Sequence, residues 1–271
     1  MHVVWNIAFA FALLVLGINA SFYVWRARVL RRLPLCDRID RLGALAAAWA
    51  FLKDSAALAA VMLSIPLGWC LPRCRSGNGT RGAIILVHGW ALNRGSLWWL
   101  RRRLLRDGWS PVCCFEYRTL NANVEPAASA LQQMITNVAS DGRPLTLIGH
   151  SLGGLVLRYC ARRYPTRSVR RIVTLGTPHF GTELARIGPL RDKLAPGAPL
   201  LNKLNAVDHL PQQFEIIAIH STFDALVLPP DAARYPGAFN IQVNDVGHNA
   251  LLFSSKVYQL IAENLAVPLR H

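Results

Sequence analysis

The sequence is short of charged residues, and of acidic residues above all. Asp, Glu, Lys and Arg make up 17% of the 271 residues, whereas a soluble domain usually carries about 25%. Fifteen acidic residues stand against 30 basic ones, almost all of them arginine, which gives a formal net charge of +15. The arginines are scattered along the chain, which is more typical of a solvated basic surface than of one binding patch. Little charge, combined with 52% hydrophobic residues, indicates contact with a membrane.

Patterns that bind metals or nucleic acids are also missing. The six cysteines are Cys36, Cys70, Cys74, Cys113, Cys114 and Cys160. Cys70 and Cys74 could form a disulfide or half of a metal site, but no His or Cys pair at a suitable distance completes a zinc pattern. We therefore expect free thiols and no metal, and the redox compartment stays open. The basic run at 101–103 has no interleaved aromatics, so nucleic-acid binding is not expected.

An uncharged run of 23 residues, 3–25, lies near the start of the chain. As a helix it would be about 34 Å long, enough to cross a hydrocarbon core of about 30 Å. Aromatic residues lie near both of its ends, as in the interfacial belts of membrane helices. They are Trp5, Phe22, Tyr23 and Trp25. The basic residues Arg26, Arg28, Arg31 and Arg32 follow the run. This order favours an uncleaved anchor over a cleaved signal peptide, which has its positive segment before the apolar core.

A second apolar stretch, 42–71, is interrupted by Lys53 and Asp54. Charges are costly in hydrocarbon unless they are paired or lie at an interface, so only 55–71 remains as a clean and rather short span. This stretch could cross the membrane or lie along it. If it crosses, the basic segment 26–41 is an inside loop, and the rest of the chain lies outside by the positive-inside rule. If it does not cross, the rest of the chain is cytoplasmic.

We divide the chain into hydrophobic, membrane-anchoring helices at 1–75, a linker at 73–81, and a second domain at 82–271. In the second domain strand and helix patterns alternate, which predicts a mostly parallel sheet of about six strands with helices on both faces. The expected strands are 83–88, 111–117, 145–149, 169–175, 214–220 and 239–243. The expected helices are 96–106, 124–139, 152–164 and 250–265.

The run Gly149-His150-Ser151-Leu152-Gly153 matches the pattern G-x-S-x-G. It follows a strand pattern and precedes a helix pattern, which is the context that a serine nucleophile on a sharp turn requires. Such a turn exposes the serine hydroxyl, and the two glycines leave room for the crowded backbone around it. We predict that Ser151 is a nucleophile.

The run Val87-His88-Gly89-Trp90 ends the first strand of the same domain. A serine nucleophile needs two backbone N–H groups to hold the oxyanion. One comes from the residue after the nucleophile and one from the loop after this strand. We predict that Leu152 and Trp90 supply them.

An acid and a histidine should follow the serine to complete a triad. Asp224 lies just past the strand pattern 214–220, where a triad acid belongs, whereas Asp245 is only three residues before the best histidine and is badly placed to orient it. That histidine is His248, between the last strand and the last helix. The other acids after the serine are Glu183, Asp192, Asp208, Glu215, Asp231 and Glu263, and the other histidines are His179, His209, His220 and His271. We predict that Ser151, Asp224 and His248 form a catalytic triad.

Together these motifs resemble the lipase branch of the α/β-hydrolase superfamily, including bacterial triacylglycerol lipases and GPI-inositol-deacylase-like serine esterases. The most branch-specific run is Thr-Pro-His-Phe-Gly-Thr at 177–182, and the resemblance covers about 82–265. It implies an α/β-hydrolase fold and hydrolysis of carboxylic esters, with a lipid or acyl ester as substrate and no cofactor. The acidic cluster that binds calcium in some secreted lipases is absent, so calcium dependence is not implied.

The segment 179–213 is long for a connection and rich in leucine, and pockets in this fold form above the strand ends. We expect a lid over an acyl pocket, with two short surface helices as the alternative. An acyltransferase, a thioesterase and a catalytically silent membrane-bound interaction module remain possible, and the oligomeric state is open. We expect an anchored protein of the bacterial inner membrane or, if the first run is cleaved, a secreted one. Because every motif lies beyond Gly82, a chain starting near Arg81 should still hydrolyse short soluble esters.

Overall fold

The computed structural model of the chain describes residues 2–32, 42–139, 142–206 and 214–269. Four residues considered above lie outside these ranges: Cys36, Asp208, His209 and His271.

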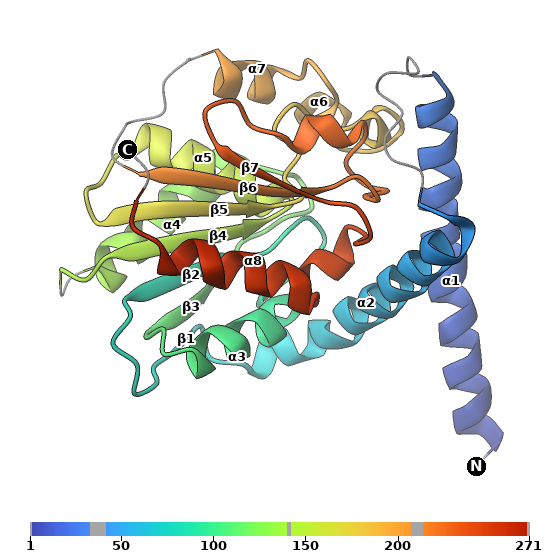
Figure 1. Ribbon diagram of the computed structural model, residues 1–271, viewed down its shortest axis with the longest axis horizontal. Coiled ribbons are helices and arrows are strands. Elements are labelled where there is room, and N and C mark those ends of the chain that lie inside the picture. The colour runs from blue at the N-terminus through green and yellow to red at the C-terminus, as the bar shows by residue number, and fades with distance from the viewer. Residues whose placement is uncertain (1, 33–41, 140–141, 207–213, 270–271) are drawn as a thin grey trace.

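Seven strands form one sheet in the order β1-β3-β2-β4-β5-β6-β7 (Figure 1). The strands are β1 (Cys74–Arg75), β2 (Ala83–Val87), β3 (Val112–Phe115), β4 (Leu145–His150), β5 (Val169–Leu175), β6 (Glu215–Ser221) and β7 (Phe239–Val243). Neighbouring strands are parallel, except that β1 is antiparallel to β3. The predicted mostly parallel sheet is confirmed, and six of its strands match the predicted ranges to within two residues at each end.

Helices cover both faces of the sheet, as predicted. The helices are α1 (His2–Arg32), α2 (Ala44–Cys70), α3 (Trp98–Arg106), α4 (Val124–Val138), α5 (Leu152–Arg163), α6 (Arg191–Leu194), α7 (Pro199–Asn205) and α8 (Ser255–Ala266). Short 3-10 turns are η2 (Arg94–Leu97), η3 (Glu183–Ile187), η4 (Pro230–Ala233) and η5 (Asn249–Leu252). In Figure 1 α3 and α8 lie in front of the sheet, and α4 and α5 lie behind it. The last predicted helix begins later than expected, at Ser255, because η5 occupies the residues before it.

Because helices cover both faces of the sheet, the central strands consist almost entirely of aliphatic residues. In β2 all five side chains, Ala-Ile-Ile-Leu-Val, are buried, which is the pattern of a parallel strand buried on both faces. Alternate residues enter two separate cores. Ile85 joins the core beneath α4 and α5, and Ile84 joins the core beneath α2, α3 and α8.

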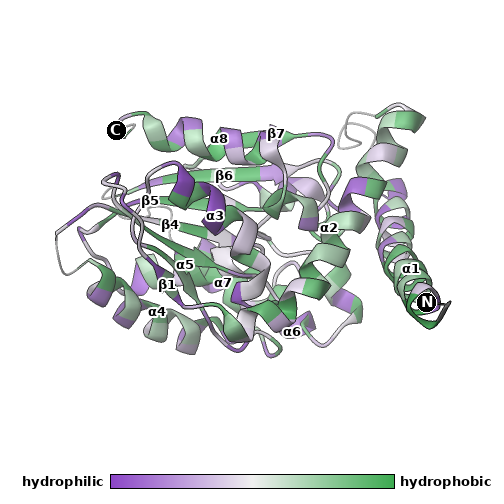
Figure 2. Cartoon of the chain, turned by 90° about the horizontal axis from the view of Figure 1, so that it is seen from below, coloured by the Kyte–Doolittle hydropathy of each residue, from purple (hydrophilic) through white to green (hydrophobic). Residues whose placement is uncertain are grey.

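α1 and α2 are the two described helices that are long and apolar enough to cross a membrane. Figure 2 shows hydrophobic residues along the length of both. α2 nevertheless packs along the sheet domain through a stripe of mostly small residues spaced three or four apart, the spacing of one helix face. The stripe is Ala50, Asp54, Ala57, Val61, Ser64 and Gly68. Backbone oxygens at its end also accept bonds from the domain, such as Ile65 O from Asn93 Nδ2 at 2.9 Å.

The segment 73–81 is not only a linker, because it contains the edge strand β1. Two residues are too few for a strand pattern to be recognised in the sequence. The antiparallel pairing places Cys74 opposite Cys113, and the two form a disulfide. The prediction of free thiols is therefore wrong for this pair and right for Cys70, Cys114 and Cys160.

Candidate active site

Ser151 lies on the turn between β4 and α5, directly above the carboxyl end of the sheet. Its backbone has φ 53° and ψ −123°, a left-handed conformation that costs free energy for a residue with a Cβ and that is concentrated at functional sites. The turn is possible because Gly153 passes close to β2, where a Cβ would come 2.4 Å from the carbonyl oxygen of Val87. Ser151 lines a cavity above this edge of the sheet.

Asp224 and His248 come from two different loops and meet in a hydrogen bond. Asp224 lies three residues after the end of β6 and His248 directly before η5. The Nδ1 of His248 is 2.6 Å from Oδ2 of Asp224, and both side chains are almost completely buried. The other oxygen of Asp224 accepts the backbone N–H groups of Leu226 at 2.7 Å and Val227 at 2.9 Å. These bonds fix the carboxylate, and the carboxylate in turn fixes the imidazole ring.

The environment of His248 favours its protonated form. Burial alone would lower the pKa of His248, but the charge of Asp224, the hydrogen bond that His248 donates to that carboxylate and the charge of Asp54 together raise the pKa above its ordinary value. With Nδ1 turned towards Asp224, the free nitrogen is Nε2, which can serve as a base. His248 and Ser151 line the same cavity, although no hydrogen bond joins their side chains among the described residues.

The two predicted oxyanion donors are the residue directly after Ser151 and a residue of the loop after β2. Leu152 is the first residue of α5, so its amide has no acceptor within the helix. Gly89 touches the nucleophile, because a Cβ at this position would come 3.0 Å from Cβ of Ser151. The peptide that joins Gly89 to Trp90 therefore passes beside Ser151.

His88 holds this loop from below instead of facing the cavity. Its ring is completely buried and lies 3.1 Å from Oε1 of Glu116 through Nε2. The hydroxyl of Tyr117 donates to the His88 carbonyl oxygen at 2.8 Å. The contacts of His88 with Glu116 and Tyr117 thus help to fix the loop that carries the Trp90 amide.

His150 supports the other side of the site. Burial first, and then the charge of His248, lower the pKa of His150 to about 3, so the ring is neutral. Its Nε2 lies 3.1 Å from the carbonyl oxygen of His248. The residue before the nucleophile therefore contacts the backbone of the loop that carries the base.

The rejected alternatives lie elsewhere in the structure. Asp245 lies 3.3 Å from Lys53 and 2.9 Å from Lys256, and not beside His248. His179 is completely buried, with Nε2 3.1 Å from Thr174 Oγ1. His220 lies within β6, inside its strand as expected.

The cavity above Ser151 has a volume of about 410 Å³ and a mostly apolar lining. The segment 182–194, between β5 and α7, supplies almost half of its lining residues, among them Leu184, Ile187 and Leu190. The opposite wall includes Trp90, and Phe22 reaches the cavity from α1. Phe22 could not be recognised as a cavity residue from the sequence, because it lies in a uniformly apolar run.

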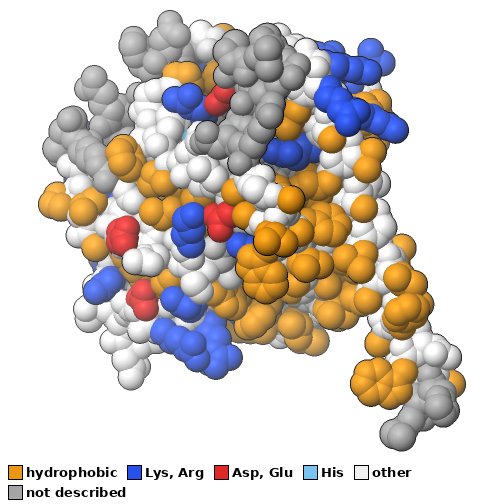
Figure 3. Space-filling view, turned by 45° about the vertical axis from the view of Figure 1, so that its right-hand side comes forward, with side chains coloured by type: hydrophobic (Ala, Val, Ile, Leu, Met, Phe, Trp, Pro, Cys, Tyr) orange, Lys and Arg blue, Asp and Glu red, His pale blue; other side chains and the backbone are white. Residues whose placement is uncertain are grey.

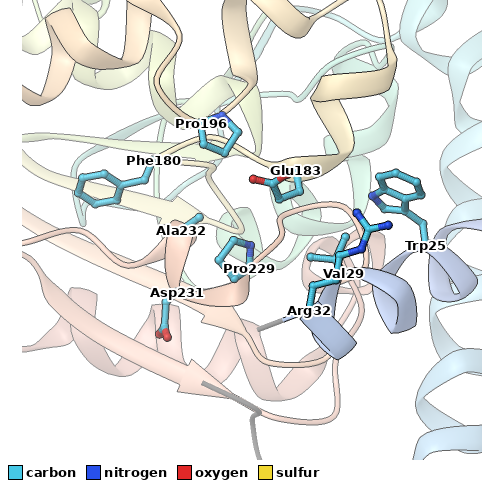
Figure 4. Close-up of a pocket in the computed structure, with 9 residues that line it drawn as sticks. All are labelled: Trp25, Val29, Arg32, Phe180, Glu183, Pro196, Pro229, Asp231 and Ala232. Atoms are coloured by element: carbon cyan, nitrogen blue, oxygen red, sulfur yellow. The ribbon is translucent and has the colours of Figure 1, made fainter. Parts of the chain in front are cut away.

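A second cavity, of about 470 Å³, lies between the end of α1 and the segments around Phe180 and Pro229. Figure 4 shows the carboxylate of Asp231 directed away from the side chains of Glu183 and Arg32. Glu183 is paired with Arg186 at 2.6 Å. The lining that the described residues form contains no serine, cysteine or histidine. The described residues also contain no group of three His, Cys, Asp or Glu side chains that could hold a metal ion.

Several solved structures with a similar arrangement of strands and helices are lipases. A lipase of Bacillus licheniformis, BlEst2 in its mature form, matches with a TM-score of 0.59 and 17% identity, over 72% of this chain and 98% of that one. A monoacylglycerol lipase of Paleococcus ferrophilus matches with a TM-score of 0.54 and 18% identity, over 71% and 97%. The chain has the α/β-hydrolase fold. A lipase B of Aspergillus fumigatus is similar over 73% of this chain and 56% of its own, with a TM-score of 0.58 and 16% identity.

A family described as a domain of unknown function (DUF7379) matches residues 72–195. This range begins just before β1 and includes the turn of Ser151, but it ends before Asp224 and His248. Identities below a fifth establish the fold alone, so the assignment of an activity depends on the geometry described above.

Proposed function

We propose that the protein is a serine hydrolase that cleaves carboxylic esters of lipids or other acyl compounds through Ser151, His248 and Asp224. One observation carries the proposal. Ser151, which follows β4 and has a positive φ, lines the same cavity as His248, and the buried His248 is hydrogen-bonded to Asp224 at 2.6 Å. The fold and the lipase neighbours are consistent with it.

The proposed reaction has two steps. His248 Nε2 takes the proton of the Ser151 hydroxyl as the oxygen attacks the ester carbonyl, and it then protonates the leaving alcohol. Asp224 holds the Nδ1 proton and stabilises the imidazolium. The amides of Trp90 and Leu152 hold the negative oxygen. Water activated by His248 hydrolyses the acyl-enzyme, so no cofactor or metal takes part.

The cavity favours an acyl chain as the group that it binds. Its apolar lining and its size suit a hydrocarbon chain, and the segment 182–194, which lies within the predicted lid 179–213, supplies almost half of the lining residues. The motion of that lid stays a prediction.

We further propose that the protein is held at a membrane. α1 is buried against the rest of the chain at Val15 and Asn19, which favours a retained helix over a cleaved signal.

The surface of the molecule suits this position. α2 exposes Trp49, Leu52, Leu63, Leu67 and Trp69. Figure 3 shows hydrophobic side chains gathered on the face between the body and α1, with basic side chains near its margins. An exposed apolar face of this kind with basic residues nearby is typical of proteins that sit in the headgroup region of a bilayer.

Two observations point to opposite sides of the membrane. The arginines at the end of α1 favour a cytoplasmic position, since α2 lies along the domain. The disulfide between Cys74 and Cys113 favours an oxidising compartment. Labelling of intact cells with an impermeant thiol reagent after reduction distinguishes them, because Cys74 is exposed.

The activity is tested with a serine-directed phosphonate probe and a panel of esters of graded acyl length. The wild-type protein should be labelled, and Ser151→Ala should lose the label and lower turnover by about 10⁴-fold or more. Labelling of the Ser151→Ala variant would exclude Ser151 as the nucleophile, and absence of labelling in a folded wild type would favour a silent module. Product analysis with a competing alcohol or a thioester separates hydrolysis of esters from acyl transfer or thioester cleavage.

A further inference from the structure

Asp54 is an acidic residue in the middle of the apolar helix α2, and its side chain is buried, with 1% exposed. Among the described residues no lysine or arginine forms an ion pair with it, and the neighbouring Lys53 is paired with Asp245 instead. An ionised carboxylate is costly to bury unless hydrogen bonds satisfy it. The hydrogen bonds of Asp54 must therefore offset the cost of burying its charge.

Those contacts lead to the loop that carries His248. Oδ1 of Asp54 accepts the backbone N–H groups of Asn249 and Ala250, both at 3.1 Å. These two residues begin η5, directly after His248. The first N–H groups of a helical turn have no partner within it, and here a distant helix supplies the acceptor. Oδ2 lies 3.2 Å from the hydroxyl of Tyr23 in α1.

The fit between α2 and this loop is tight enough to depend on a glycine. A Cβ at Gly247, the residue before His248, would come 2.1 Å from Cγ of Asp54. On the other side of the loop, His150 contacts the carbonyl oxygen of His248. The loop is thus held from one side by the turn of the nucleophile and from the other by Asp54.

We propose that Asp54 is a positioning residue of the active site: its carboxylate fixes the backbone at 249–250, so that His248 stays aligned with Asp224 and with Ser151. This inference rests on the proposed serine-hydrolase function. It makes α2 a part of the catalytic unit, although the helix lies outside the strand–helix alternation that carries the motifs.

The charge of Asp54 should affect the pKa of His248, and packing alone would not have this effect. Burial raises the pKa of Asp54 to about 6, so the carboxylate is ionised above that pH. Its charge is one of the influences that raise the pKa of His248. Loss of the charge should lower the pKa of His248. Other ionisable groups lie around Asp54 and His248. They are Asp224 after β6, His150 at the end of β4, Tyr23 and Arg26 on α1, and the cluster of Lys53, Asp245 and Lys256.

The test compares four full-length variants in detergent micelles, with kcat expressed per phosphonate-labelled site. Asp54→Asn keeps the size and one acceptor oxygen, Asp54→Ala removes the acceptor, and Gly247→Ala pushes the loop away from α2. Asp245→Asn is the matched control, because it removes a carboxylate from the same loop that does not bind its backbone. We expect kcat to fall about tenfold in Asp54→Asn and about 100-fold in Asp54→Ala and Gly247→Ala, as for misplacement of a catalytic group by about 1 Å.

Two further readouts separate positioning from loss of folding. KM should hardly change, because Asp54 does not line the cavity, and the acid limb of the kcat/KM profile should move to lower pH in Asp54→Asn but not in Asp245→Asn. The pKa of His248, measured by NMR with labelled histidine in a Ser151→Ala background, should fall in Asp54→Asn. This measurement needs no activity, so it tests the inference even if the proposed hydrolase activity fails.

The inference is overturned if both Asp54 variants stay within about twofold of the wild type per labelled site, or if the His248 pKa is the same with Asp54→Asn and without it. An equal shift with Asp245→Asn would also overturn it. If Asp54→Ala does not fold, Asp54→Asn and the NMR measurement still decide.

Discussion

α1 and α2 are both long apolar helices, but their surroundings differ. Both are apolar and long enough to cross a membrane, yet 11% of the apolar window of α1 is buried, against 33% for α2. The difference lies in a few positions: α2 places small and polar residues such as Asp54, Ser64 and Gly68 on one face, and that face meets the sheet domain. Hydropathy alone cannot separate an anchor from a domain helix, whereas a stripe of small and polar residues at helical spacing can.

The largest effect should come from removing both helices. A chain beginning at Gly82 lacks α2, β1 and the disulfide, so the contacts of α2 lead us to expect the opposite of the sequence-based prediction. Its activity on soluble esters should fall by about 10³-fold or more, since a buried face and the Asp54 contacts are lost. A chain beginning at Gly43 keeps α2 and should retain activity within about tenfold.

Ester turnover and circular dichroism of the two truncated chains check this prediction. Alkaline carbonate extraction is the accompanying measurement, since full-length protein should stay with membranes while the chain from Gly43 is released more easily. A fully active chain from Gly82 would mean that α2 is an anchor like α1.

The second-largest effect concerns the stripe of buried residues on α2. It is tested at two adjacent residues, one inside the stripe and one outside it. Ser64 is buried at 1% and Leu63 is exposed at 64%. Ser64→Leu should overpack the contact with the domain and lower the free energy of unfolding by about 1–3 kcal/mol. Leu63→Ser should change it by less than about 0.5 kcal/mol. Urea unfolding in one detergent measures both, and similar values for the two variants would contradict the assignment of the faces.

The pH dependence of the wild type tests whether α2 acts on His248. His248 must be neutral to accept the serine proton, so kcat/KM should rise with pH through the pKa of His248. Because Asp224 and Asp54 raise that pKa above 6.5, the midpoint of the acid limb should lie above 6.5. Steady-state kinetics on a soluble ester over the acid and neutral range give this midpoint, and a value below 6.5 would contradict it.

The smallest effect should come from α1. The hydroxyl of Tyr23 lies 3.3 Å from the carbonyl oxygen of Phe223, next to Asp224, and Arg26 donates to the Thr222 oxygen at 2.8 Å. Tyr23→Phe removes the hydroxyl but keeps the ring against Phe223, so kcat should fall by about two- to fivefold, as for loss of one modest hydrogen bond. Stopped-flow or steady-state kinetics measure this. If kcat of Tyr23→Phe fell as far as that of Asp54→Ala, α1 and α2 would contribute equally to catalysis.

Strong local patterns made most of the fold predictable. Six strands follow from buried aliphatic runs between turn residues, and the chain order of Ser151, Asp224 and His248 is enough to bring the acid and the histidine to one edge of a parallel sheet. The structure places Asp224, and not Asp245, against His248. The triad as a working unit remains a proposal.

The rest depends on contacts between residues far apart in the chain. Asp54 was recognisable as a charge that needed a partner, but its partners are backbone amides 195 and 196 residues away. β1 is too short to leave a pattern, so the pairing of Cys74 with Cys113 was missed. Phe22 is one apolar residue among many, and nothing in the sequence distinguishes it as part of the cavity.

The disulfide also affects α2 through the connectivity of the chain. It closes a loop over a sequence separation of 39, which in the chain-entropy estimate stabilises the fold by about 4 kcal/mol. α2 ends at Cys70, four residues before Cys74. A helix tethered by so short a segment has an effective concentration in the millimolar range beside its own docking face. If the contacts of α2 open for a moment, the helix therefore rebinds instead of separating, and Asp54 returns with it to the loop of His248.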